Sequence, residues 1–356
     1  MRIIRFLLAL AAASGPVLAR GDIPPSPYAE LTGRGREVRG LFVSTPHLAI
    51  RGHRRIGGLA RAARLDAVVI DVKDERGRVL FASEVPALQG SRVVVHRDLR
   101  ALVSDLRNRG HYVIGRVVCF KDDSLTTARP DLAVLDDRTG RPWRSNSRSR
   151  WLDPGNAEVQ SILVALSREV QTLGFDEVQF DYVRYPVDRL TEHAVFPSAD
   201  GTLRRRVVAR FLQAADAALG IPISVDVFGL TTFRTGDPTG IGQSLEDMAP
   251  HVEVISPMLY ASDFGSNWIR TDHAHPIGPI VWKSIRNVRE RLGHAVAIRP
   301  YLQAFGFRAP GYGPEFMQVQ IQAARGAGAD GYLFWNPGTS YGTVFQTLAR
   351  MGPFRR

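Results

Sequence analysis

The 356-residue chain contains one cysteine, Cys119, so no disulfide bond can form within it. Cys119 lies in an apolar run, which favours a buried side chain over a nucleophile. The sequence also lacks a His-Glu-x-x-His motif, a His-x-His in its first expected strand and a Gly-x-Ser-x-Gly motif. These absences argue against a metal-dependent hydrolase and against an acyl-transferring serine. We expect no metal and no other cofactor.

Lysine is scarce, because it supplies only three of the 46 basic residues. The net charge of +11 would by itself be compatible with nucleic-acid binding. The arginines, however, are scattered over expected helix faces, and no nucleic-acid-binding motif accompanies them. We interpret them as solvated surface charges and expect no nucleic-acid partner. An affinity for anionic envelope polymers is the alternative.

Residues 1–19 have the pattern of a secretory signal peptide, in which Arg2 and Arg5 precede an apolar segment and Val17-Leu18-Ala19 offers a cleavage site. The apolar segment is too short to span a bilayer comfortably, and no run of membrane length follows. We therefore expect an exported protein, periplasmic or extracellular, without a stable membrane span. Residues 20–37 are rich in Pro, Gly and Arg and are expected to form a mobile tether to a single domain at 38–352.

From residue 38 onward, short apolar strands alternate with segments of helical periodicity. We expect eight strands, at Val38–Thr45, Ala67–Asp74, Tyr112–Phe120, Glu177–Tyr185, Pro222–Gly229, Glu253–Tyr260, Ala297–Phe305 and Gly331–Asn336. Because parallel strands need helical crossovers, this alternation predicts an α/β fold, the (β/α)8 TIM barrel. A doubly wound sheet is the alternative, but the residues after the first strand, Ser44-Thr45-Pro46-His47, are no glycine-rich phosphate turn.

One crossover helix has clear end signals. Its apolar stripe runs from Val159 to Leu173, and we expect Asp153 as the N-cap, Pro154 at the first helical position and Gly174 as the stop.

The strand at 177–185 is where we expect the site. Side chains alternate along a strand, so Glu177, Gln179 and Asp181 share one face, which we expect to point into the barrel. The next strand directs Asp226 inward in the same way. Carboxyl ends of barrel strands converge on one site, so Asp181 and Asp226 are our candidate catalytic residues. Their mutual repulsion would raise one pKa and suit that group to be the acid.

The alternative for either aspartate is a buried ion pair with Lys73, Arg184 or Arg299. For Asp71 and Lys73, the alternative to sugar binding is a self-satisfied ion pair between them. Trp335 is the best candidate for stacking on a sugar ring, ahead of Trp143, Trp151 and Trp268. The long connection from Lys121 to Asn156 follows a strand and is expected on the catalytic face. The candidate substrate-binding residues are Asp71, Lys73, Asp74, Lys121, Asp122, Arg184, Tyr260, Asp263, Gln303, Trp335 and Asn336.

Several motifs occur in the same order as in one bacterial family. They are Val69-Ile70-Asp71-Val72-Lys73-Asp74, Phe120-Lys121-Asp122, the stretch from Gly174 to Pro186, Asp226-Val227-Phe228-Gly229, Ile255-Ser256-Pro257-Met258 and Leu333-Phe334-Trp335-Asn336. From Val38 to Gly342 the chain resembles the bacterial glycosyl hydrolase domain family, a domain of unknown function with an expected TIM-barrel fold. The resemblance implies an exported or envelope-attached glycosidase that acts on a polysaccharide through acidic residues.

The chain departs from the family pattern at two places. Where the family leads us to expect Tyr-Pro-Ser-His, the chain has Tyr260-Ala261-Ser262-Asp263. Where it leads us to expect Leu-Gln-Asp, the chain has Leu302-Gln303-Ala304. The carboxylate missing at Ala304 favours the alternative function, a non-catalytic glycan-binding or envelope-organising barrel.

Overall fold

The computed structural model describes residues 33–44, 58, 60, 65–93, 98–187, 189–237, 239–264 and 276–351. The expected signal peptide, most of the expected tether, Thr45 and Trp268 lie outside the described residues.

The main sheet is a closed parallel barrel with eight strand positions, one of which is formed by two consecutive short segments. Its order is β10-β11-β1-β2-β3-β5-β7-β8-β9, and a further pairing between β10 and β8 closes it. The barrel strands are β1 (Arg39–Val43), β2 (Ala67–Lys73), β3 (Tyr112–Val118), β5 (Glu177–Asp181), β7 (Ile223–Phe228), β8 (Val254–Leu259), β9 (Ala297–Ile298), β10 (Tyr301–Gln303) and β11 (Tyr332–Trp335). This architecture confirms the predicted TIM barrel.

The seventh expected strand is divided into β9 and β10, and both segments pair with β8. The break falls at Arg299 and Pro300. Proline has no N–H to donate to the neighbouring strand, which explains why the ladder is interrupted there. The fourth expected strand also ends earlier than predicted, at Asp181. Tyr182 has φ 50°, a left-handed conformation that stops an extended strand.

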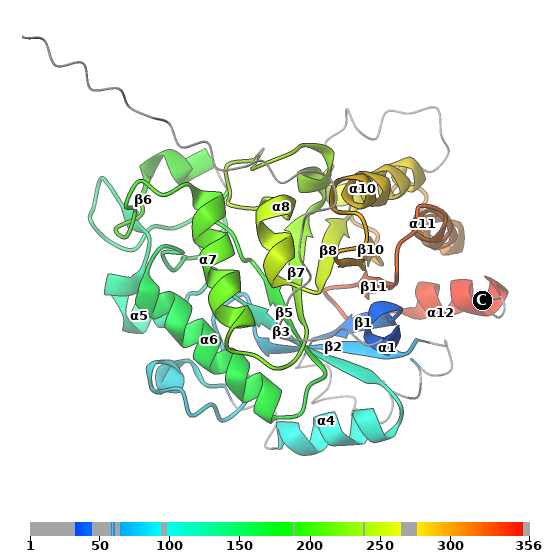
Figure 1. Cartoon of the computed structure of the whole chain (residues 1–356), viewed down its shortest axis with the longest axis horizontal. Helices are drawn as coiled ribbons and strands as arrows, with labels where there is room; N and C mark the ends of the chain where they lie inside the picture. The colour runs from blue at the N-terminus through cyan, green and yellow to red at the C-terminus, as the bar shows by residue number, and fades with distance from the viewer. Residues whose placement is uncertain are drawn as a thin grey trace, which may run out of the picture.

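Helices surround the barrel and pack their apolar faces on its outer side (Figure 1). They are α4 (Leu99–Asn108), α5 (Leu125–Ala128), α6 (Ala157–Thr172), α7 (Arg204–Asp216), α8 (Leu245–Met248), α10 (Ile277–Leu292), α11 (Pro314–Gly326) and α12 (Gly342–Met351). A further short helix, α1 (Gly33–Arg36), has no apolar side chain and precedes the first strand. Short 3-10 turns occur at Pro86–Ser91, Pro130–Leu132, Arg189–His193, Gly229–Phe233, Ala249–His251 and Ala261–Asp263. Two short strands, β4 (Leu135–Asp136) and β6 (Ala194–Val195), pair antiparallel as a separate sheet.

The N-cap predicted for α6 is wrong. Asn156 caps the helix, because its side chain accepts hydrogen bonds from the backbone N–H groups of Glu158 (2.9 Å) and Val159 (3.2 Å). Asp153 lies before the turn that leads into the helix. Its carboxylate accepts from the N–H groups of Gly155 (3.0 Å) and Ser198 (2.7 Å). The end of α6 is as predicted, since Gly174 follows it with φ 93°.

The inside of the barrel has its own small apolar core, which includes Phe42, Val69, Ile114, Tyr301 and Leu333. The opposite faces of the strands belong to the larger core beneath the helices, and the buried Cys119 lies there as predicted. Val178 and Phe180 of β5 also face that outer core. The predicted inward face of β5 is therefore confirmed.

Polar side chains from β5 form pairs across the barrel interior. Glu177 forms an ion pair with Arg299, and both side chains are fully buried. Tyr112 donates a hydrogen bond of 3.1 Å to the same carboxylate. Arg299 also donates to the carbonyl of Gly35 in α1 (3.1 Å). Residues 33–36, which we expected in a mobile tether, are thus helical and contact the barrel.

Breaking the Glu177–Arg299 pair should be costly for stability. Glu177→Ala leaves the Arg299 guanidinium buried without a counter-ion, and we expect the free energy of unfolding to fall by about 3–5 kcal/mol. Urea unfolding measures this. The control is Asp131→Ala, which removes a carboxylate from an exposed pair with Arg129 and should cost less than about 1 kcal/mol. Equal losses in the two variants would contradict the role of burial.

Candidate active site

A cavity of about 480 Å³ opens at the carboxyl ends of the barrel strands. Six of the predicted site residues line it, namely Asp181, Arg184, Asp226, Tyr260, Asp263 and Trp335. Residues outside the predicted site also line it, among them Arg116 from β3 and Tyr301 from β10. The two candidate catalytic aspartates therefore share one cavity at the end of the barrel where barrel enzymes carry their active sites.

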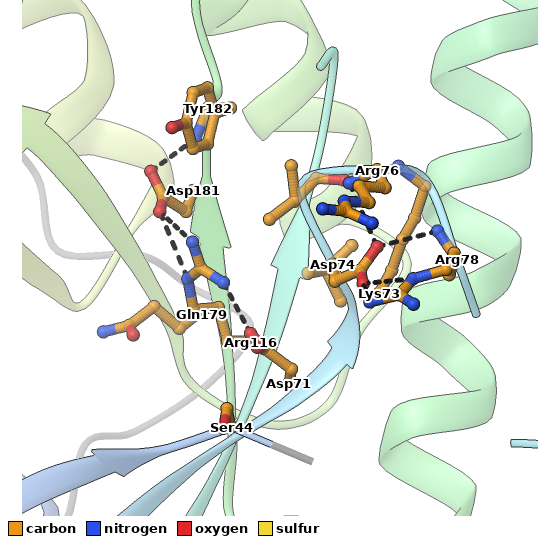
Figure 2. Close-up of polar contacts among 12 residues, drawn as sticks. Ser44, Asp71, Lys73, Asp74, Arg76, Arg78, Arg116, Gln179, Asp181 and Tyr182 are labelled. Carbon is orange, nitrogen blue, oxygen red and sulfur yellow. Dashed lines mark hydrogen bonds and ion pairs between the residues drawn. The ribbon is translucent and has the colours of Figure 1, made fainter. Parts of the chain in front are cut away.

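Asp181 is the last residue of β5, and it is held on both carboxylate oxygens. Arg116 donates to Oδ2 from Nε (3.1 Å) and from Nη2 (2.5 Å), while the N–H of Tyr182 donates to Oδ1 (2.6 Å), as Figure 2 shows. The left-handed backbone at Tyr182 aims that N–H. Strained backbone of this kind is found where the surrounding structure enforces it, often in active sites.

Asp226 on β7 has the opposite environment. Its side chain is 1% exposed, and its Oδ1 has no hydrogen-bond partner among the residues that the structure describes. Burial raises the pKa of Asp226 well above its usual value, and the charge of Asp181 raises it further, while Arg116 and Arg299 oppose the shift. An uncharged carboxylic acid is therefore favoured at this position.

Arg116 connects the site to β2. Besides Asp181, it donates from Nη1 to Asp71 (2.5 Å), as Figure 2 shows. Its guanidinium lies 5.0 Å from the centroid of the Trp335 ring and 5.4 Å from that of the Phe42 ring. Burial raises the pKa of Asp71 to about 7, although Arg116 opposes this shift. Asp71 is not part of the cavity lining, but it accepts a hydrogen bond from Arg116, which holds Asp181.

The sequence of this chain matches a family model described as "Putative glycosyl hydrolase domain" over residues 40–341. The chain belongs to this family. The resemblance expected from the motifs between Val38 and Gly342 is thereby confirmed, and membership of this family is consistent with a hydrolase and suggests a carbohydrate substrate. No curated protein matches the chain.

Several solved glycoside hydrolases have a similar fold. The glycoside hydrolase domain of PgaB (BpsB) from Bordetella bronchiseptica is 12% identical with a TM-score of 0.59, over 89% of this chain and 96% of that one. The α-galactosidase TtGalA from Thermus thermophilus is 20% identical with a TM-score of 0.54, over 91% and 64%. The α-L-fucosidase isoenzyme 2 from Paenibacillus thiaminolyticus is 12% identical with a TM-score of 0.58, over 88% and 49%. These similarities support the barrel fold.

In this glycosyl hydrolase domain, Lys73 and Asp122 lie away from the cavity. They form a fully buried ion pair of 2.9 Å, and Lys73 also donates to the carbonyl of Val118 (2.8 Å). The alternative prediction, an ion pair between Asp71 and Lys73, is therefore wrong. The pairing of β2 with β3 shifts register between these two residues, so each finds a different partner on the β3 side.

Four more predicted binding residues support loops and do not line the cavity. Asp74 accepts from the N–H groups of Arg76 and Arg78 and pairs with the Arg78 side chain. Gln303 donates to the carbonyls of Phe305 and Phe307, and both of these aromatics line the cavity. The other two are Lys121, which lies 4.9 Å from the Tyr182 ring, and Asn336, which donates to the carbonyl of Ala304 (2.5 Å).

The aromatic and acidic members of the lining are themselves packed. Trp335 stacks on Phe42 with ring centroids 4.0 Å apart, so one face of the indole is covered. Burial raises the pKa of Tyr260 and of Asp263, whose carboxylate accepts from Ser262 Oγ (3.0 Å). Ala304 is fully buried and lies outside the lining, whereas Asp263, the other departure from the family pattern, lies within it.

A second cavity, of about 730 Å³, lies along the loop between β3 and α6. Its one carboxylate, Asp136, is paired with Arg138. Because hydrolysis by paired carboxylates needs two such groups, we assign the chemistry to the barrel cavity. Trp143 and Trp151 of the same loop are buried packing residues.

The described ranges contain no group of three or more His, Cys, Asp or Glu side chains that could hold a metal ion. Within the same ranges, no helix has both the length and the apolar character that a membrane crossing needs.

Proposed function

We propose that the protein hydrolyses glycosidic bonds of a polysaccharide with Asp181 and Asp226 as the reacting pair. The observation that carries this proposal is the contrast between two carboxyl groups in one cavity. Arg116 forms an ion pair with the Asp181 carboxylate, whereas Asp226 is buried, its Oδ1 has no hydrogen-bond partner among the described residues, and burial raises its pKa. A glycosidase needs one carboxylic acid as proton donor and one carboxylate as base or nucleophile, and the two environments suit these two roles.

In the proposed reaction, Asp226 donates its proton to the oxygen of the leaving sugar. Asp181 either attacks the anomeric carbon or takes a proton from the attacking water, and the separation of the two carboxyl groups around the bound sugar decides between these routes. Arg116 holds Asp181 in position by its paired N–H bonds. Asp71 holds Arg116 from the other side.

We further propose that the polysaccharide belongs to the cell envelope or the extracellular space. The support is the signal-peptide pattern of residues 1–19 and the strong excess of arginine. Cell fractionation tests this proposal, and full-length protein that stays in the cytoplasm would contradict it.

The test of the activity is the release of reducing ends from a panel of envelope and extracellular polysaccharides. We expect turnover of at least one polymer by the wild-type protein and only a small residual rate by Asp226→Asn. Binding across the panel without turnover by either protein would instead select the non-catalytic glycan-binding barrel, which the carboxylate missing at Ala304 favours.

A further inference from the structure

Arg184 is a buried cation in the active-site cavity. Arg184 is 7% exposed and lies in the turn that follows β5. Three aromatic rings surround the guanidinium carbon, with centroids 4.4 Å (Phe228), 4.9 Å (Trp151) and 5.0 Å (Tyr182) away. These rings fix the plane of the guanidinium by stacking.

The Arg184 guanidinium has no carboxylate partner among the described residues. Its Nη1 donates to the carbonyl of Tyr185 (3.0 Å). The other two nitrogens make no hydrogen bond to a described residue, and Arg184 lines the cavity. The other inward-facing arginines differ, since Arg116 pairs with two aspartates and Arg299 with Glu177.

A buried charge without a counter-ion is expensive to maintain. Burial lowers the pKa of Arg184 for this reason, with Tyr182 and Asp181 opposing the shift. Arg184 nevertheless lies in the cavity. An anionic ligand bound beside it would supply a counter-ion and offset the free-energy cost of burying its charge. The charge balance of the lining fits such a ligand. Arg116 pairs with Asp181 and with Asp71, burial raises the pKa of both Asp226 and Asp263 and so opposes their negative charge, and Arg308 adds a second cation that has no ion pair with any described residue.

We propose that the cavity binds an acidic sugar, a uronic acid unit whose carboxylate accepts hydrogen bonds from Arg184. This inference rests on the proposed function, because it names the class of polysaccharide that the site takes. A planar guanidinium held between aromatic rings presents paired N–H donors in one plane, which matches a carboxylate. The rings of Phe228 and Tyr182 also line the cavity and offer apolar surface to the sugar.

The test measures binding apart from turnover. Full-length Asp226→Asn protein is titrated calorimetrically with matched pairs of oligosaccharides. The pairs are oligogalacturonates with their methyl esters and glucuronate-containing hyaluronan oligomers with their carboxyl-reduced forms. We expect the acidic member of at least one pair to bind about ten-fold more tightly or better, because a hydrogen bond to a charged partner is lost in the neutral one. The preference should weaken as salt is raised.

Adding Arg184→Gln to the same protein should abolish the preference, and Arg184→Lys, which keeps the charge without the planar fork, should retain part of it. Arg204→Gln is the matched control. Arg204 also stacks on two rings, those of Tyr185 and Phe196, and donates to one carbonyl, that of Gly240, but it does not line the cavity. Thermal unfolding confirms that each variant is folded.

Equal affinity for both members of every pair, or a preference that survives Arg184→Gln, would overturn the inference. Two further outcomes distinguish a failure of this inference from a failure of the proposed function. Wild-type hydrolysis of neutral polysaccharides alone would keep the activity and reject the acidic sugar. Carboxylate-dependent binding through Arg184 without turnover of any uronate polymer would keep the binding site and reject the hydrolase.

Discussion

Asp181→Asn is expected to lower kcat/KM for glycan hydrolysis by about 10³-fold, a middle value for the loss of a group that acts as base or nucleophile. The amide keeps the shape of the side chain and can still accept from Arg116, but it can neither attack the anomeric carbon nor take a proton from water. The loss should appear in kcat, because the side chain acts on the reacting bond and not on the remote parts of the polymer. Initial rates of reducing-end release over a range of substrate concentrations measure it.

The matched control for this variant is Asp71→Asn. Asp71 binds the same Arg116 at 2.5 Å but does not line the cavity. We therefore expect a loss of about ten-fold or less, since Arg116 keeps its two bonds to Asp181. If Asp181→Asn were as active as the wild-type protein, or if the two variants lost activity equally, Asp181 would have no direct part in the chemistry.

Asp226→Asn is expected to lose a similar factor, about 10²–10⁴, because an amide cannot donate a proton to the leaving oxygen. The pH profile of wild-type activity should also report the ionisation of Asp226. A general acid works only while protonated, so activity should fall on the alkaline side as Asp226 loses its proton. The raised pKa places this limb well above the usual range of an aspartate. If the residual activity of Asp226→Asn fell on the alkaline side at the same pH as the wild-type activity, the assignment of Asp226 as the general acid would be contradicted.

The same pKa shift predicts a pH-dependent difference in stability. The folded state holds the Asp226 proton more tightly than the unfolded state, in which the pKa is about 3.9. Stability from this group is complete below the unfolded pKa and is lost as pH rises toward the folded pKa, with a limiting slope of about 1.4 kcal/mol per pH unit. Asp226→Asn has no carboxyl group at this position, so its stability does not fall with pH for this reason. Urea unfolding should therefore show the variant gaining stability relative to wild type between pH 4 and pH 8, and a constant difference would count against the shift.

Much of the fold could be predicted because the barrel strands are short apolar runs separated by helical periodicity. The exceptions are local. Asp153 and Asn156 are both good N-caps, and only the course of the turn between them decides which one precedes the helix. The early end of β5 depends on the left-handed backbone of Tyr182, a residue with no preference for that conformation. Such choices are made by packing and not by the local sequence.

The candidate site was predictable where it follows from strand alternation. Asp181 and Asp226 were identified because each is an acidic residue at the inward face of a strand end, and both line the cavity. Arg116 was missed because it lies within β3, between apolar neighbours and short of the strand end. The available signal was the charge itself, since a buried arginine in a strand needs an acidic partner. The pairing of Lys73 with Asp122 depends on a register shift that the sequence pattern does not reveal.

The claim that Asp181 and Asp226 act together on one bond is tested most directly by the double variant Asp181→Asn/Asp226→Asn. Residues that act as a unit have strongly non-additive effects on rate. We predict that the double variant loses no more kcat/KM than the more damaged single variant. Losses that multiply, so that the double variant falls by the product of the two single factors, would show that the two carboxyl groups act independently and would contradict the account.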